Sequence, residues 1–199
     1  RCRADFYRGF GGRFARWLIA KEIQPSYHSY GNGSGMRVSA AGFMAKSIEE
    51  CIDLATKTAL PTHDHPEGIK GAVATALAIF YGMQGKDKDF IRKQVLDEYY
   101  PNWSALTYES IKQGYGFDET CQQTIPAALI CFLERRNYED CLKLAIALGG
   151  DADTLAAISG PMAYAFYKTM PEELIANAKA KLPDWMLQVN EELDQFVNQ

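Results

Sequence analysis

The sequence lacks the patterns that mark secreted, disulfide-bonded and membrane proteins. Its five cysteines are an odd number without Cys-x-x-Cys spacing, so we expect free, mostly buried thiols in a reducing compartment. No stretch approaches the roughly 20 apolar residues that a membrane-spanning helix requires, and no basic-then-apolar leader opens the chain. These absences predict a cytoplasmic protein with no membrane partner.

Neither sign of charge dominates. The chain has 21 Lys and Arg residues against 25 Asp and Glu residues, a formal net charge of −4, and its basic residues are scattered. A nucleic-acid partner is therefore not expected, because binding a phosphate backbone requires a concentrated basic surface. With 199 residues, 47% of them hydrophobic, the chain is long enough for one globular domain over residues 1–199.

Strand-type alternation is almost absent, and helical spacing of apolar residues is nearly everywhere. Apolar side chains recur every three or four positions over residues 69–80, 125–133 and 174–196, and Pro66 suits the first turn of the first of these helices. Glycine, proline, serine and aromatic residues mark loops at 25–35, 59–64, 100–104 and 114–118. The pattern predicts a single all-α domain with loops that carry function.

The stretch Leu-Gly-Gly-Asp-Ala-Asp-Thr, residues 148–154, places two carboxylates at a loop-to-helix junction. Asp153 is a plausible N-cap for the helix that follows, and both charges suit a helix N-terminus. Alternatively, Asp151, Asp153 and Thr154 supply the oxygen ligands that Mg²⁺, Mn²⁺ or Ca²⁺ prefers. A single segment cannot complete a metal site, so further ligands would have to come from elsewhere.

The stretch Tyr-Gly-Asn-Gly-Ser-Gly-Met-Arg-Val, residues 30–38, is rich in glycine. Consecutive backbone N–H groups can converge there on a phosphate or a ribose phosphate, although a flexible turn without a ligand explains the same pattern. The dinucleotide fingerprint fails because Met36 stands where its last glycine belongs, and a Walker loop fails because Gly-Lys-Ser/Thr is missing.

Two histidines lie in the stretch Pro-Thr-His-Asp-His-Pro-Glu-Gly, residues 61–68. His63 and His65 are spaced as in some zinc sites, but the segment before them lacks β-strand character and no third ligand is apparent. We expect Asp64 or Thr62 to cap the helix that begins at Pro66, with one histidine facing a ligand.

A fourth stretch carries two aromatic residues, Tyr115 and Phe117, on either side of Gly116. Aromatic side chains in such a loop can stack on a planar ring such as adenine, or they can close the end of a helical core. Both interpretations stay open on the residues alone.

Taken in order, these stretches resemble the ADP-ribosylglycohydrolase family. Residues 31–37 resemble its Gly-Asn-Gly-x-x-Met-Arg loop, residues 62–67 its Thr-His-x-x-Pro-Glu segment, and residues 149–154 its Gly-Gly-Asp-x-Asp-Thr signature. The stretch 114–126 is similar to the region before the family's later helices. The resemblance implies a single-domain, all-α orthogonal helical bundle of the ADP-ribosylglycohydrolase type.

The resemblance also implies an activity and a site. A two-metal Mg²⁺ or Mn²⁺ centre would remove ADP-ribose from modified protein side chains, so the expected partners are ADP-ribosylated protein or ADP-ribose. The metal ligands implied by position, of which the first two are also the implied catalytic residues, are Asp151, Asp153 and Thr154. The implied substrate-binding residues are Asn32, Gly33, Ser34, Gly35, Met36, His63 and, near the adenine, Tyr115.

The sequence departs from the family pattern at its start. The family's early Gly-Asp and Thr-Asp-Asp-Thr motifs, which supply the other metal ligands, are absent from residues 1–30. We therefore expect an N-terminally truncated family domain, with possible homo-oligomerisation through the face left uncovered. Two alternatives remain: a non-catalytic relative that binds ADP-ribose or serves structurally, and a different metal-dependent hydrolase that cleaves a phosphoester or a nucleoside.

Overall fold

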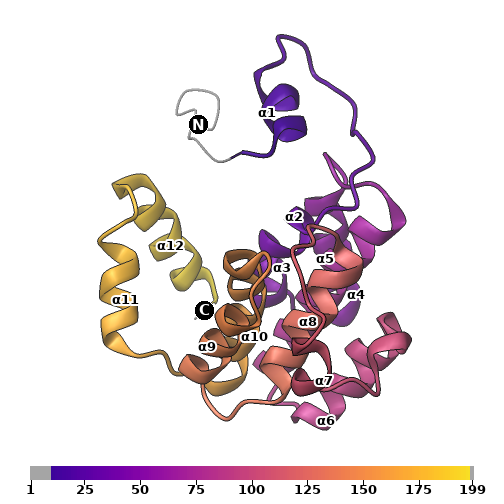
Figure 1. Ribbon diagram of the computed structural model, residues 1–199. Helices are drawn as coiled ribbons and strands as arrows, with labels where there is room; N and C mark the ends of the chain where they lie inside the picture. The colour runs from indigo at the N-terminus through magenta and orange to yellow at the C-terminus, as the bar shows by residue number, and fades with distance from the viewer. Residues whose placement is uncertain (1–9, 198–199) are drawn as a thin grey trace.

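The computed structural model describes residues 10–197, and over these residues the protein is helical throughout (Figure 1). Its one β-type contact is an isolated antiparallel bridge between Gly31 and Thr120. The all-α prediction is therefore confirmed. The helices, with η1 a π-helix and η2 a 3₁₀-helix, are α1 (Gly12–Ile19), α2 (Gly33–Met36), α3 (Ser39–Met44), α4 (Ile48–Ala59), α5 (Pro66–Met83), α6 (Lys88–Ile91), η1 (Arg92–Asp97), η2 (Pro101–Trp103), α7 (Tyr108–Lys112), α8 (Cys121–Leu133), α9 (Tyr138–Leu148), α10 (Ala152–Tyr167), α11 (Glu172–Lys179) and α12 (Asp184–Val197).

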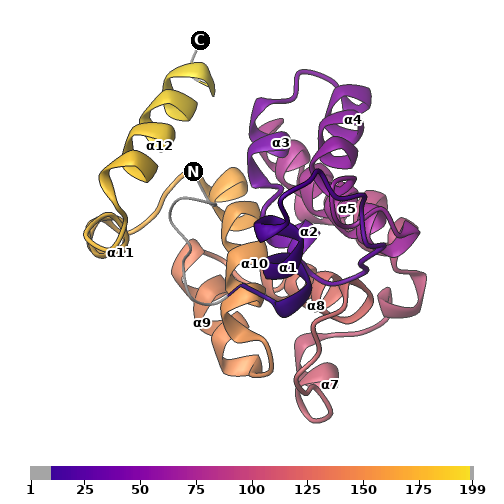
Figure 2. The same cartoon turned by 90° about the horizontal axis from the view of Figure 1, so that it is seen from above.

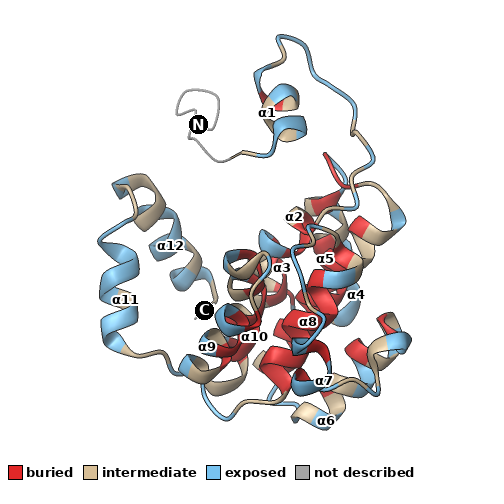
Figure 3. Ribbon diagram, in the orientation of Figure 1, coloured by how far each residue is buried: buried red, intermediate tan, exposed pale blue. Residues whose placement is uncertain are grey.

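Helix α5 is the axis of the core. Pro66 opens it, as the sequence predicted, and from Gly71 to Gly82 every residue is buried. A helix that is apolar all round is stable only when neighbours cover every side. Helices α2, α3, α4, α8 and α10 surround it, and Figure 3 shows its residues within the buried centre of the molecule.

Close helix crossings depend on small side chains. At Gly42 in α3, an added Cβ would lie 2.6 Å from the carbonyl oxygen of Ala76 in α5. This glycine therefore allows α3 to approach the backbone of α5 more closely than any larger residue would permit. Helix α3 is thereby packed closely against the core, directly after the Gly-rich stretch in the chain.

The residues 174–196, predicted as one helical pattern, form two helices, α11 and α12, because α11 ends at Lys179, before Pro183. A proline after the end of a helix cannot continue its hydrogen bonding. Neither helix has a fully buried residue, and both lie to one side of the bundle in Figures 1 and 2.

The segment before α2 also leaves the bundle. Helix α1 is tied to the chain that returns from it, since Trp17 Nε1 donates to the carbonyl of Pro25 at 3.0 Å and Arg13 donates to the carbonyl of Tyr27 at 2.6 Å. Within residues 10–197 no helix is both long and apolar enough to cross a membrane. The described cysteines, Cys51, Cys121, Cys131 and Cys141, are free and buried as expected, whereas Cys2 lies outside the described residues.

Candidate functional site

Asn32 joins two of the stretches that the sequence singled out. Its side-chain Nδ2 donates to the carboxylate of Asp151 at 2.6 Å and to the hydroxyl of Thr124 at 3.1 Å, and the residue is almost fully buried. The Gly-rich stretch, which contains α2, the start of α8 and the start of α10 therefore meet at one side chain.

Backbone hydrogen bonds hold Asn32 in this place. The N–H of Asn32 donates to the carbonyl of Glu119 at 2.7 Å, and the N–H of Cys121 donates to the carbonyl of Tyr30 at 2.9 Å. These two bonds form the antiparallel bridge at the N-terminus of α8. Because both partners are backbone groups, the approach of residues 30–32 to the 118–121 loop does not depend on side-chain identity.

The acidic stretch lies at a helix start, but its cap differs from the prediction. Asp151 is the N-cap residue of α10 and makes no side-chain capping bond, whereas Asp153 lies in the first turn, so the expectation that Asp153 is the N-cap was wrong. Gly149 and Gly150, both with positive φ, turn the chain before Asp151, and α10 begins at Ala152, earlier than an Asp153 N-cap would give.

The side chain of Asp151 is partly buried beside Asp153. Burial raises its pKa, and the neighbouring Asp153 raises it further, while the hydrogen bond from Asn32 opposes the change. The raised pKa shows that the negative charge of Asp151 is disfavoured here. A cation that binds between the two carboxylates would stabilise their ionised forms. Asp153 itself is exposed, and its Oδ1 accepts the N–H of Thr154 at 3.0 Å.

The donor atoms at this helix start have the chemistry of a hard-cation site. Carboxylate oxygens of Asp151 and Asp153 and the hydroxyl of Thr154 come from one short segment, residues 151–154, at the start of α10. Among residues 10–197, however, no group of three or more acidic, histidine or cysteine side chains is placed to hold a metal ion. The site thus supplies suitable oxygens for part of a coordination shell.

The two histidines of residues 61–68 have separate environments. His65, rather than the expected Asp64 or Thr62, caps α5: its Nδ1 accepts the N–H of Glu67 at 3.1 Å. The expected caps were wrong because Asp64 instead bonds to the hydroxyl of Ser26 and Thr62 to His63.

His63 is buried and faces the Gly-rich stretch. Its Nε2 lies 3.2 Å from the position that a Cβ on Gly33 would occupy, so Gly33 leaves the room that this ring needs. Burial, the nearby guanidinium of Arg37 and that of Arg13 lower the pKa of His63 to about 4. The imidazole is therefore neutral at physiological pH.

The remaining residues of the Gly-rich stretch divide between core and surface. The side chain of Ser34 is fully buried and donates to the carbonyl of Gly68 at 2.7 Å, and Gly35 packs directly against Ile125. Met36 is half-exposed, and its Sδ lies 4.0 Å from the hydroxyl of Thr154. The side chains of Met36 and Asn32 thus reach the acidic stretch, whereas that of Ser34 does not.

Tyr115 packs behind the acidic stretch. Its ring lies 3.1 Å from the position that a Cβ on Gly150 would occupy, and its hydroxyl is buried. Burial raises the pKa of Tyr115 to about 12. Phe117, two residues on, is exposed.

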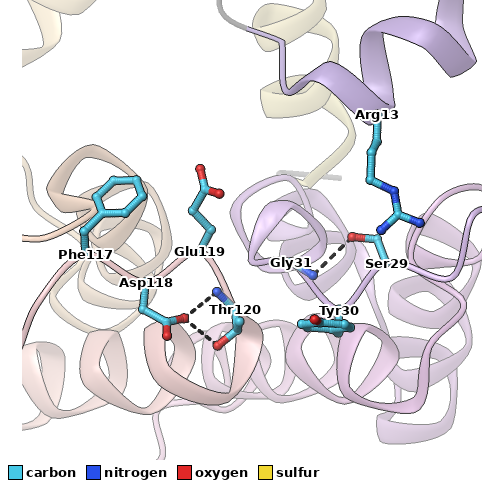
Figure 4. Close-up of a pocket in the computed structure, with 8 residues that line it drawn as sticks. All are labelled: Arg13, Ser29, Tyr30, Gly31, Phe117, Asp118, Glu119 and Thr120. Atoms are coloured by element: carbon cyan, nitrogen blue, oxygen red, sulfur yellow. Dashed lines mark hydrogen bonds between the residues drawn. The ribbon is translucent and has the colours of Figure 1, made fainter.

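A cleft of about 460 Å³ opens beside the bridge. Figure 4 shows its lining, with Arg13 above Ser29 at one end and Phe117 at the other. Asp118 in its floor accepts from both the N–H and the hydroxyl of Thr120. Sequence reasoning missed Tyr30 and Arg13 here, although an aromatic residue directly before the Gly-rich motif was a signal for the first.

Comparison with known proteins shows which family the chain belongs to. The family profile described as ADP-ribosylglycohydrolase matches residues 4–198. The chain belongs to the ADP-ribosylglycohydrolase family. The family resemblance predicted from the motifs is thereby confirmed over nearly the whole chain.

Named relatives agree with the family assignment. The chain is 27% identical to ADP-ribosylhydrolase ARH3 of Homo sapiens over 183 residues, which cover 70% of this chain and 50% of that protein, and the figures for ARH3 of Bos taurus are the same. An uncharacterized protein of Archaeoglobus fulgidus is 27% identical over 164 residues, covering 74% of this chain and 53% of that protein. The chain thus spans about half the length of these relatives.

A solved structure shows the same fold. A chain titled "ADP-ribosylglycohydrolase-related protein complex" superposes with a TM-score of 0.66 at 22% identity, covering 92% of this chain and 64% of that chain. The helical architecture of the ADP-ribosylglycohydrolase family is therefore present in this protein.

Proposed function

We propose that this protein is a hydrolase that removes ADP-ribose from modified protein side chains by cleaving the glycosidic bond. The observation that carries the proposal is the bond between Asn32 and Asp151, which joins the family's Gly-Asn-Gly loop to its Gly-Gly-Asp-x-Asp-Thr signature. Membership of the family and the ARH3 relatives support the same reaction class.

In this proposal the start of α10 holds a divalent cation, Mg²⁺ or Mn²⁺, and the complete family site would hold two. Asp151, Asp153 and Thr154 are the ligands, and their oxygens are the donors that these hard cations prefer. When bound, such a cation can orient the distal ribose through its hydroxyls, lower the pKa of a water molecule and stabilise developing negative charge. The remaining ligand oxygens have to come from outside this cluster.

The protein's own groups bind and orient the substrate. Asn32 holds the Asp151 carboxylate at the junction, and the neutral His63 and the short helix α2 face the diphosphate-ribose. Ser34 contributes through its backbone, since its side chain is bonded in the core. Gly35 leaves room for Ile125, and its N–H donates to the carbonyl of Asn32 at 2.9 Å.

The adenine ring has two candidate places. The sequence resemblance put it near Tyr115, whose partly buried ring lies beside Gly150. The open cleft is lined by Tyr30 and Phe117, and both are exposed, as an aromatic residue that stacks on a ligand must be. We therefore place the adenine in the cleft, with Tyr115 supporting the turn behind it.

A non-catalytic ADP-ribose-binding protein is the second candidate. It is favoured because no group of three or more acidic, histidine or cysteine side chains in residues 10–197 is placed to hold a metal ion, and two carboxylates from one segment hold a cation weakly.

One pair of measurements separates the two candidates. We expect release of ADP-ribose from an ADP-ribosylated peptide in the presence of Mg²⁺, and loss of that release with EDTA or in Asp151→Asn. Calorimetric binding of ADP-ribose without any turnover would support the binding protein instead. Absence of both binding and turnover, with or without Mg²⁺, would contradict both.

A further inference from the structure

The two ring nitrogens of His63 face different partners. Its Nδ1 lies 2.7 Å from the hydroxyl oxygen of Thr62 and 3.5 Å from Nη2 of Arg37. Its Nε2 faces the Gly-rich loop on the side of Gly33. One nitrogen is thus engaged within the protein, and the other is directed toward the candidate site.

The direction of these hydrogen bonds is fixed by Arg37. A guanidinium group can only donate, and Nη2 of Arg37 donates to the hydroxyl oxygen of Thr62 at 2.8 Å. The hydroxyl oxygen of Thr62 has a second lone pair, so this bond alone does not decide which atom donates to which. The guanidinium charge of Arg37, 3.5 Å from Nδ1 of His63, disfavours a proton on Nδ1, and the Thr62 hydroxyl therefore donates to Nδ1. In a neutral imidazole whose Nδ1 accepts, the proton is on Nε2.

Arg37 is itself held in place. Its Nη2 also donates to the carbonyl of Thr58 near the end of α4, at 2.9 Å. A proton on Nδ1 would point at both this guanidinium and a hydroxyl that already accepts from it. The charges around the ring, Arg37 and Arg13 against Asp64, together with its burial, also disfavour the doubly protonated imidazolium.

We propose that Arg37 and Thr62 are positioning residues that hold His63 as a neutral imidazole with its proton on Nε2. This Nε2–H is directed at the Gly-rich stretch, residues 31–36, where it donates to a phosphate oxygen of the ligand. The identity of the ligand rests on the proposed function, but the tautomer and its cause do not. Thr62 connects the two groups: its hydroxyl oxygen accepts a hydrogen bond from Arg37, and its hydroxyl hydrogen is donated to Nδ1 of His63.

The first test reads the tautomer in the ligand-free protein. Two-dimensional ¹⁵N–¹H NMR of the imidazoles at pH 7, with His63 assigned by its disappearance in His63→Gln, should show a protonated Nε2 and an unprotonated Nδ1. Thr62→Ser should keep this pattern, whereas Thr62→Val should mix the two tautomers. A wild-type spectrum with the proton on Nδ1, or an unchanged pattern in a folded Thr62→Val variant, would overturn the proposal.

The second test reads the consequence for binding. In calorimetric titrations with ADP-ribose, Thr62→Val should weaken the affinity by about tenfold, the equivalent of one lost hydrogen bond, whereas Thr62→Ser should stay within about twofold of wild type. Equal affinities of wild type and Thr62→Val would overturn the binding role. If the wild-type protein does not bind ADP-ribose at all, the proposed function fails, and the NMR result still decides the positioning role.

Discussion

The side-chain amide of Asn32 donates to the carboxylate of Asp151 across 2.6 Å, although the two residues are 119 positions apart in the chain. The same amide nitrogen donates to the hydroxyl oxygen of Thr124, whose own hydrogen is directed to the carbonyl of Asp118 at 3.1 Å. The Asn32 amide therefore has one favourable orientation, with its NH₂ group toward Asp151. This contact ties the Gly-rich loop to the acidic helix start.

Replacing Asn32 with aspartate should therefore destabilise the fold. Asn32→Asp keeps the shape of the side chain but puts a carboxylate against that of Asp151, and loses both donated hydrogen bonds. We expect the free energy of unfolding at pH 7 to fall by about 2 kcal/mol, measured by denaturant titration. The control is Asn102→Asp, which adds the same charge at an exposed position; an equal effect of the two variants would contradict the role given to Asn32.

Gly150 should tolerate no side chain. Its φ is +66°, and an added Cβ would lie 2.6 Å from the carbonyl oxygen of Gly116. Gly150→Ala combines backbone strain with a steric clash, whereas Gly85→Ala, at a φ of +69° in open space, has the strain alone. We expect Gly85→Ala to cost about 1 kcal/mol and Gly150→Ala at least twice that in denaturant titrations. Equal costs would show that the turn can shift away from the 114–118 loop.

Lys88 should stabilise the end of α8. Its ammonium donates to the carbonyls of Phe132 at 2.9 Å and Leu133 at 3.1 Å and to that of Arg135, and it lies among the rings of Phe132, Phe166 and Tyr167. Lys88→Met keeps the side-chain length but leaves these carbonyls without their donor, so we expect a loss of about 3 kcal/mol.

The matched control for Lys88 is Lys86→Met, since Lys86 contacts a single ring, that of Phe90, and is exposed. Its effect on the free energy of unfolding should be within about 0.5 kcal/mol. A Lys88→Met variant as stable as Lys86→Met would show that water replaces the ammonium at no cost.

His63 should make the stability of the protein depend on pH. Its pKa in the folded protein is about 4, below the ordinary value of 6.5, because of burial and the charges of Arg37 and Arg13. Between these two values the unfolded chain binds more protons than the folded one, so stability falls as the pH is lowered from about 6.5 toward about 4. The melting temperature of His63→Gln should fall less steeply over this window than that of wild type, and parallel curves would contradict the assignment.

Much of the architecture was predictable from local pattern. The apolar spacing around residues 69–80 and 125–133 gave α5 and α8, and Pro66 marked the start of α5. Helix boundaries were less predictable, because caps depend on partners elsewhere. Asp64 does not cap α5 because its carboxylate accepts a hydrogen bond from the hydroxyl of Ser26. Residues 174–196 form two helices because Pro183 lies between them.

The candidate site was predictable as a set of stretches but not as a set of contacts. The motifs containing Asn32, His63 and Asp151 were recognised, yet nothing in their order along the chain shows that Asn32 bonds to Asp151 or that His63 faces Gly33. Ser34 belongs to the same motif as Asn32, but its side chain is directed into the core. Alternate residues of a one-turn helix point to different sides, and only packing against α5 decides which side is the core.

The sequence by itself determined the helical class, the family and the residue types available for chemistry, because these follow from apolar periodicity and from short motifs. Only the tertiary structure decided the cap of α10, the cleft beside Tyr30 and the contacts that join Arg37, Thr62 and His63. The physical reason is that a hydrogen bond or a steric limit between residues distant in the chain depends on how helices pack around α5. Local spacing does not contain that information.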